Sequence, residues 1–478
     1  MKSSNKLISN IYSSDRISFY ILFLLTIIIV YFLPPFFKQI YFFSILSIFW
    51  KSKKNYFWFA FVLLIADAPG KLFTPNNEIH NLQFIDLFGF RELYFTEVFF
   101  IIAFIKSFKT RTKLNLFFKN NLYIFGFYTL FLFLISFTYF TDMITVLKTI
   151  RMLLPYTLIY SMPILMSKID DYHNFFKLIL PLAFIILIFQ LAEITLFKNS
   201  INIILGGSAY DYLRASRVHL FYSTWLHLII FCGSIFYATY KKNIFNQTML
   251  SIIPMLVILS YLITGTRGYF IAFTLMLILY SIFIKKGVSK YTFVFVLFSI
   301  LLYLFLSINP IISDVFDSST QRILTMKDLY EGDVTAGGSL SRISDRSPRV
   351  MKKFVESPIF GFGFSQDYYE YSDVHVGNQT LLLQGGIIGY LLFLLFWFNF
   401  SIKLILLNYR IAFKNPYHNT PLIFVITLLG LLIIHSSSGY IFNYQIIYLN
   451  SMPISIIMIF IFASKVYKEI SSSRLRPC

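Results

Sequence analysis

Residues 309–380 read NPIISDVFDSSTQRILTMKDLYEGDVTAGGSLSRISDRSPRVMKKFVESPIFGFGFSQDYYEYSDVHVGNQT, and they form the only long polar interval in a chain of successive apolar runs. The apolar stretch LLLQGGIIGYLLFLLFWF follows directly at residues 381–398. Unpaired backbone groups in hydrocarbon are strongly unfavourable, so we expect this polar interval to lie in water on one side of a bilayer. We therefore expect the chemistry of the protein to take place there.

The composition around this interval is that of a membrane protein. Of the 478 residues, 57% are hydrophobic and 13% are charged, and the mean hydropathy is +0.70. Soluble domains carry about a quarter charged residues, so we expect an all-α polytopic membrane protein. The net charge of +19 does not predict nucleic-acid binding, because the Lys and Arg residues lie in short clusters between the apolar runs. Cys232 and Cys478 have no metal-ligand spacing, and we expect neither a metal nor a cofactor.

Fourteen apolar runs are candidate membrane spans. They cover residues 17–36, 39–50, 55–66, 92–106, 121–140, 147–166, 175–196, 219–240, 248–265, 269–284, 291–308, 379–402, 420–437 and 443–464. The second and third runs are short for independent spans, so we expect 12–14 transmembrane helices. The chain then divides into membrane helices over 1–308, a long outer loop with short helices over 309–378, and C-terminal helices with a tail over 379–478.

The basic residues predict the orientation of these spans. Clusters within residues 2–16, 51–54, 106–113, 241–242, 285–290, 403–414 and 465–476 all fall on one side when fourteen spans are threaded. That side is the cytoplasm by the positive-inside rule, and it holds both termini. The first apolar run is too long for a signal peptide, which predicts an uncleaved span. The loops at 67–91, 197–218, 266–268, 309–378 and 438–442 then face outward.

A short helix is expected inside the long loop. Ser347 and Pro348 match the start of a helix, and the following Ser357-Pro358 would end it. Arg346 and Arg349 bracket this start, and Arg342 lies four residues earlier. If the helix extends backward, the three arginines share one face.

Three further arginines are predicted on the outer face. Arg267 lies in TGTRGYF between two apolar runs, and Arg214 and Arg217 precede another run. Arg267 could be an anchor at the membrane surface or a ligand for an anion. Asp211 could pair with Arg214 or Arg217, so Arg217 could contact an anion or form a structural pair.

A histidine and a tyrosine-rich segment complete the candidates. His375 lies at the membrane mouth and could be structural or a general base, and His435 is a second candidate. The segment QDYYEYSD at 366–373 could grip sugar rings through Tyr368, Tyr369 and its carboxylates, or it could be a solvated loop. Outward arginines at the hydrocarbon border suit a lipid-linked pyrophosphate, whose oxygens match the guanidinium fork.

Two segments resemble a known family. SRISDRSPRVMKKFVESPIFGFGF at 341–364, followed by His375 and GGIIGY at 385–390, resembles the C-terminal signature of Wzy-type O-antigen polymerases, O-antigen ligases and related bacterial oligosaccharide transferases. TGTRGYF is similar to the family's S-x-S-R-G segment and places Arg267 at its arginine, while Arg217 is similar to the family's other outer-face arginine. Val376 departs from the ligase pattern, which has Asn, Ser or Gln after the histidine, and Asn378 is a displaced equivalent.

The resemblance implies a metal-independent, inverting glycosyl transfer in the bacterial inner membrane. An undecaprenyl-pyrophosphate-linked glycan would be the donor, with Arg217 and Arg267 on its pyrophosphate and His375 as the general base. The expected substrate-binding residues are Arg214, Arg342, Arg346, Arg349, Asn378, Tyr368 and Tyr369. A flippase and a chain-length regulator are the implied partners, and O-antigen or capsular polysaccharide is the implied product.

Two alternatives stay open. The same site could move the glycan to lipid A-core or to a protein, as an O-antigen ligase or O-oligosaccharyltransferase does. A transporter for polysaccharide or lipid-linked glycan is the non-enzyme alternative. The sequence shows no internal repeat and one long outer loop, which favours an enzyme. The departure at Val376 favours the polymerase over the ligase.

Overall fold

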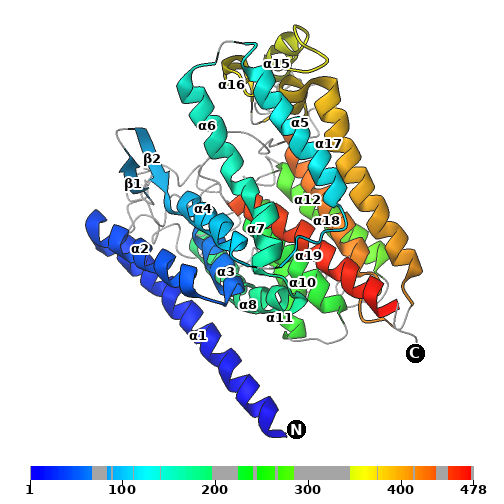
Figure 1. Cartoon of the computed structure of the whole chain (residues 1–478). Helices are drawn as coiled ribbons and strands as arrows, with labels where there is room; N and C mark the ends of the chain where they lie inside the picture. The colour runs from blue at the N-terminus through cyan, green and yellow to red at the C-terminus, as the bar shows by residue number, and fades with distance from the viewer. Residues whose placement is uncertain are drawn as a thin grey trace.

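A computed structural model describes residues 2–66, 83–87, 90–110, 112–139, 141–195, 224–240, 245–263, 267–284, 345–373, 375–412, 415–437 and 451–474. Within these ranges the chain is largely helical (Figure 1). The described parts of the predicted apolar runs are mostly helical; the run at 92–106 starts in a strand, and the run at 291–308 lies outside the described residues. The helices are α1 Lys2–Phe32, α2 Pro35–Lys51, α3 Asn55–Ala66, α4 Phe95–Phe108, α5 Lys119–Ser136, α6 Met143–Leu153, α7 Leu158–Leu165, α8 Ile169–Thr195, α10 Thr224–Thr239, α11 Gln247–Ile263, α12 Arg267–Phe283, α15 Ser347–Phe354, α16 Gln366–Tyr371, α17 Gly377–Arg410, α18 Thr420–Ser437 and α19 Ser451–Arg474.

Three helical segments in the described ranges are long and apolar enough to cross a membrane. They are Met143–Leu165, which joins α6 to α7 through a short 3-10 turn, Ile169–Phe189 and Gly377–Arg410. Five shorter apolar helices accompany them, between Asn55 and Ala66 and at 225–239, 247–262, 268–283 and 420–436. These segments indicate a membrane protein. The predicted count of 12–14 spans and the predicted orientation stay predictions.

A β-hairpin departs from the all-α expectation. Strands β1 Gln83–Leu87 and β2 Phe90–Tyr94 pair antiparallel directly before α4. They fall mostly in the predicted outer loop 67–91. The fold is therefore helical with one two-stranded sheet in the described residues.

Aromatic side chains fill the core of the bundle. Helix α10 packs against α8, α11, α18 and α19, and the rings of Phe236 of α10 and Phe462 of α19 lie 4.8 Å apart. Two histidines in this core are bonded to tyrosines: His173 Nδ1 lies 2.7 Å from the Tyr237 hydroxyl, and His227 Nδ1 lies 2.8 Å from that of Tyr261. These contacts explain both histidines as parts of the packed interior.

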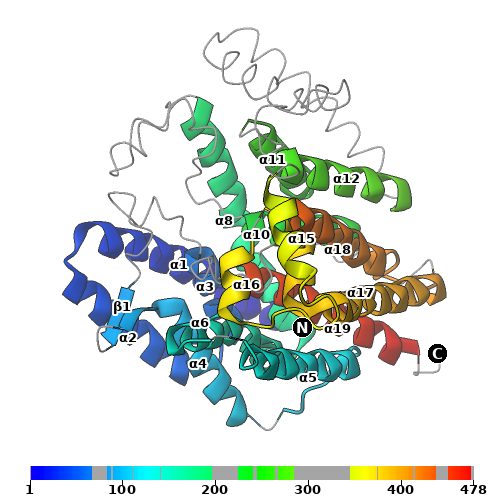
Figure 2. The ribbon, with the colours of Figure 1, turned by 90° about the horizontal axis from the view of Figure 1, so that it is seen from above.

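The short helices α15 and α16 lie across one end of α5 and α17 (Figures 1 and 2). The predicted loop helix is α15, which begins at Ser347 with Pro348 in its first turn, where proline has no required N–H bond to lose. It ends at Phe354, slightly before the predicted stop. Its apolar side chains Val350 and Phe354 are buried in a cluster that includes Leu383 of α17, which holds the helix against the bundle.

Candidate active site at the start of α17

Helix α17 is broken at one glycine. Gly386 has φ 61° and ψ −167°, a conformation that only glycine adopts readily. A Cβ added there would lie 2.2 Å from the carbonyl oxygen of Ile359. The close approach of another segment of backbone therefore requires glycine at this position.

The segment that approaches is the turn between α15 and α16. Four backbone hydrogen bonds join it to the break: Phe362 N–H to Leu383 O at 2.9 Å, Gly363 N–H to Gln384 O at 2.9 Å, Ile387 N–H to Pro358 O at 2.9 Å and Ile388 N–H to Ile359 O at 3.3 Å. The carbonyl and amide groups on both sides of the break thus find partners in the turn. The turn and the broken helix form one hydrogen-bonded unit.

The glycines of the G-F-G sequence fit the turn between two helices. Gly361 and Gly363 both have positive φ. A Cβ at Gly361 would lie 2.4 Å from Gln384 O of α17, and one at Gly363 would lie 2.3 Å from Leu132 O of α5. The Phe364 N–H donates to Ser136 Oγ of α5 at 2.7 Å. These glycines serve close packing of backbone rather than a phosphate loop.

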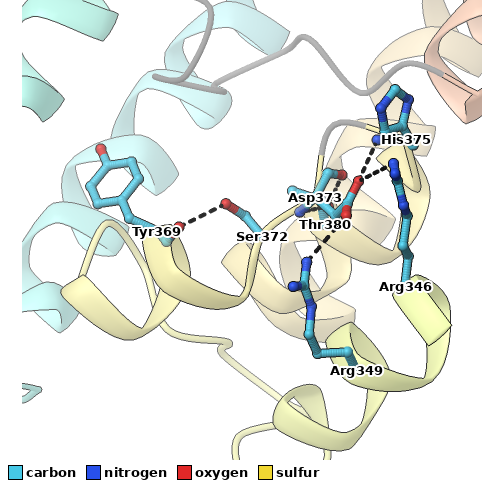
Figure 3. A network of polar contacts seen from close by, with 7 residues as sticks. All are labelled: Arg346, Arg349, Tyr369, Ser372, Asp373, His375 and Thr380. Atoms are coloured by element: carbon cyan, nitrogen blue, oxygen red, sulfur yellow. Dashed lines mark hydrogen bonds and ion pairs between the residues drawn. The ribbon is translucent and has the colours of Figure 1, made fainter.

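Beside this unit, one carboxylate gathers several of the predicted residues (Figure 3). Asp373 Oδ2 lies 3.1 Å from Arg349 Nη2, and its Oδ1 lies 3.7 Å from Arg346 Nη1. The backbone N–H of His375 donates to Asp373 Oδ1 at 2.8 Å, while the imidazole ring points away from the carboxylate. We call Arg346, Arg349, Asp373 and His375 the Asp373 cluster.

The Asp373 cluster is fixed to the first turn of α17. The hydroxyl of Thr380 donates to the carbonyl oxygen of Asp373 at 2.8 Å and accepts the Asp373 N–H at 3.2 Å. Val376, at the N-cap position, supplies no side-chain acceptor for the helix amides. Among the described residues, Asp373 is paired with two guanidinium groups next to the positive end of the α17 dipole, and these three side chains carry one net positive charge that suits an anion.

A partly buried lysine holds α15 in place. Lys353 Nζ donates to Glu356 at 2.7 Å and lies 3.2 Å from Asp367 of α16. It also lies 4.8 Å from the ring centre of Phe362 and 5.3 Å from that of Tyr371. The hydrogen bond to Glu356 raises the pKa of this ammonium, and Asp367 adds to the effect. These contacts join α15, the turn and α16.

Tyr368 and Tyr369 do not offer their rings to a ligand in this structure. Both side chains are buried in a cluster with Val350, and the Tyr369 hydroxyl shares a 2.8 Å hydrogen bond with Thr149 Oγ1 of α6. A ring that stacks on a sugar must have an open face, and neither ring has one. We therefore assign both to packing instead of the sugar contact that the sequence suggested.

His435 lies buried next to the beginning of α17. Its ring centre is 5.8 Å from that of Phe393, and the backbone of Gly377 approaches the imidazole. Neither ring nitrogen makes a hydrogen bond of normal geometry among the described residues. Its predicted role as a second candidate for the general base stays a prediction.

The other predicted residues divide into two groups. Asn378 lies in the first turn of α17, beside the Asp373 cluster. Arg267 is the first residue of α12, and the description does not extend to its side chain. The remaining three, Arg214, Arg217 and Arg342, lie outside the described residues, so their predicted roles stay predictions.

Sequence reasoning missed the ion pairs formed by Asp373 and by Glu97. It named Asp373 as a sugar-binding carboxylate, not as the partner of arginines more than twenty positions earlier. It did not single out Glu97 of α4 and Arg151 of α6, which form a two-point pair with both N···O distances at 2.8 Å. Glu97 is buried, so this pair joins α4 to α6 inside the protein.

Among the described residues, no group of three or more His, Cys, Asp or Glu side chains is placed to hold a metal ion. The predicted absence of a metal stays a prediction. No protein-family model, curated protein or solved structure matches this chain. The family resemblance therefore depends on the sequence motifs alone.

Proposed function

We propose that the protein is a glycosyltransferase that polymerises polyprenyl-pyrophosphate-linked oligosaccharide repeat units into O-antigen or capsular polysaccharide. The proposed location is the outer face of the bacterial inner membrane. The observation that carries the proposal is the Asp373 cluster, a net positive group with a histidine at the start of a helix long enough to cross a membrane. A lipid-linked pyrophosphate carries its charge among the lipid headgroups, next to the hydrocarbon.

A polymerase must hold two lipid-linked pyrophosphates, one on the donor and one on the acceptor. We assign the donor pyrophosphate to Arg217 and Arg267, following the family resemblance. Arg346 and Arg349 then take the acceptor, because Asp373 neutralises only one of their two charges. Asp373 would hold both guanidinium groups apart and oriented before the ligand arrives.

In the proposed step, an acceptor hydroxyl oxygen attacks the anomeric carbon of the donor sugar. A new C–O bond forms as the bond to the pyrophosphate breaks, and the leaving group departs with the electron pair. His375 takes the hydroxyl proton, and Arg217 and Arg267 neutralise the charge on the leaving pyrophosphate. A single displacement inverts the configuration at the anomeric carbon.

Complementation tests this proposal. Wild type and the variants His375→Ala, Arg267→Ala and Arg217→Ala are expressed in the source strain after deletion of the gene, and surface polysaccharide is resolved as a gel ladder beside protein level. Lys352→Ala is the matched control, because Lys352 is an exposed cation of α15 outside the Asp373 cluster. We expect a ladder from wild type and the control, and single repeat units from the other variants.

Two outcomes would replace the proposal. Polymer that accumulates on the polyprenyl carrier in the deletion strain, without reaching its acceptor, would identify a ligase. Well-expressed His375, Arg267 and Arg217 variants with normal ladders would remove the proposed catalytic roles.

A transporter is the second candidate, and the break in α17 favours it. Interrupted helices line the substrate sites of many transporters. An assay with purified protein in detergent separates the two functions. Transport needs a membrane between two compartments, whereas an enzyme can extend a lipid-linked glycan in detergent. Chain extension in detergent supports the polymerase. Movement of labelled substrate across vesicles without extension supports the transporter.

A further inference from the structure

The turn between α15 and α16 exposes apolar side chains where the sequence predicts contact with water. Ile359 is 54% exposed and Phe360 is 43% exposed, and Val355 at the end of α15 is also exposed. The charged side chain of this turn, Glu356, lies at its start, where it is 58% exposed and pairs with Lys353 at 2.7 Å. Exposure of these apolar side chains to water is unfavourable in free energy. An apolar patch of this kind marks a surface that contacts another apolar phase or molecule.

The exposed tip continues onto the outward faces of two helices. Ile387, Ile388 and Leu391 of α17 are exposed next to the four backbone hydrogen bonds that join the turn to the helix. On the other side, the Phe360 ring lies 5.8 Å from that of Phe131, an exposed residue of α5. The turn and both helix faces therefore form one apolar surface.

The depth of the turn follows from its attachment to α17. The helix begins at Gly377 and breaks at Gly386, so the turn reaches about 13 Å along the axis from the start of the helix, at 1.5 Å per residue. The headgroup layer on each side of a bilayer is roughly 5–8 Å thick. If the polar Asp373 cluster lies among the headgroups, the turn reaches the hydrocarbon.

Polar backbone groups of the turn are hydrogen-bonded within the protein, as a position in hydrocarbon requires. Irregular backbone is tolerated in a membrane only where its polar groups are bonded within the protein. The amides of Phe362 and Gly363 and the carbonyls of Pro358 and Ile359 all bond to the break in α17. The break in α17 thus supplies hydrogen-bond partners for the backbone of the turn.

We propose that residues 357–360, the tip of the turn, form a re-entrant element that inserts into the bilayer, with lipid acyl chains as its occupant. The element holds the Asp373 cluster at headgroup depth, since the turn, α15 and α17 are joined by hydrogen bonds. The proposal does not depend on the reaction that the protein catalyses, so a failure of the glycosyltransferase proposal leaves it standing.

Nitroxide labelling tests the insertion. A Cys232→Ala, Cys478→Ser background receives a single cysteine by Phe360→Cys or Ile359→Cys, and the full-length protein is labelled in phospholipid vesicles. Collisions of the label with oxygen, which concentrates in lipid, and with a water-soluble nickel chelate are measured. Leu391→Cys on the exposed face of α17 is the lipid reference, and Lys352→Cys on α15 is the water reference.

We expect the oxygen-to-nickel collision ratio at positions 359 and 360 to match that at 391 and to exceed that at 352 several-fold. Nickel collisions at the level of position 352 would place the turn in water and overturn the proposal. Low collisions with both reagents would show that protein, such as a second copy of the chain, covers the turn, and this would also overturn it. Two labelled positions guard against a local effect of one substitution.

Discussion

The backbones of Gly386 and Ile359 are in contact. A Cβ atom built on Gly386 would lie only 2.2 Å from the carbonyl oxygen of Ile359. The contact joins a helix of the membrane domain to a loop that precedes it in sequence. The hydrogen bonds around it satisfy the broken helix and the turn together. The site at the start of α17 is therefore built on a contact between two backbones.

Gly386→Ala is expected to destabilise the protein. The positive φ alone costs an alanine about 1–3 kcal/mol, and the overlap with Ile359 adds to this. Thermal unfolding in detergent measures the effect. Gly126→Ala in α5 is the control, because a Cβ there meets nothing within 4 Å, and alanine is the better helix former by about 1 kcal/mol. If the Gly386→Ala protein unfolded at the same temperature as the wild type, the close contact between Gly386 and Ile359 would be refuted.

Asp373→Asn is expected to strengthen binding of inorganic pyrophosphate and to make it more dependent on salt. The substitution removes the negative charge between two guanidinium groups but keeps an oxygen for the His375 N–H. Because both arginines are partly exposed, the stability should change by less than about 1 kcal/mol. Titration calorimetry at low and high salt measures the binding.

Glu370→Gln is the matched control for Asp373→Asn, since it removes an exposed negative charge from α16. It should leave pyrophosphate binding nearly unchanged. Equal effects of the two substitutions would mean that only the overall charge of the protein matters. Weaker binding by Asp373→Asn would mean that Asp373 acts by orienting the arginines more than by opposing them.

Breaking the Glu97–Arg151 pair from one side is expected to cost about 3 kcal/mol, at the low end for buried pairs because Arg151 keeps some exposure. Glu97→Leu leaves the guanidinium without this carboxylate in the interior. The double variant Glu97→Leu with Arg151→Met should recover most of the loss, since the apolar pair needs no compensation. Unfolding temperatures of the two variants test this. Equal loss in both would assign the effect to packing.

Tyr369→Phe is expected to lower stability by about 1 kcal/mol and to leave polysaccharide synthesis intact. The change removes the hydroxyl that bonds Thr149 but keeps the buried ring. Thermal unfolding and the gel ladder measure the two effects. Synthesis lost without a change in stability would return Tyr369 to the substrate-binding residues.

The helical elements were largely predictable from local sequence. Apolar runs such as 121–140 and 420–437 specify helices through composition and length, which are local properties. The beginning of α15 was predictable to within one residue, because Pro348 fits the first turn of a helix; the predicted N-cap Ser347 is instead the first helical residue, with Arg346 at the N-cap position and no side-chain capping bond. The hairpin at 83–94 escaped because its strands carry no strict alternation of apolar and polar residues.

The assembly of the site depends on contacts between distant elements. The sequence displayed Gly361, Gly363 and Gly386, yet nothing in it states that the turn bonds to the break in α17. It displayed Asp373, Arg346 and Arg349 as separate candidates, and folding made one carboxylate the partner of both arginines. Helix formation depends on neighbours a few positions away, whereas these contacts depend on how whole elements pack, and packing is not encoded at any single stretch of the chain.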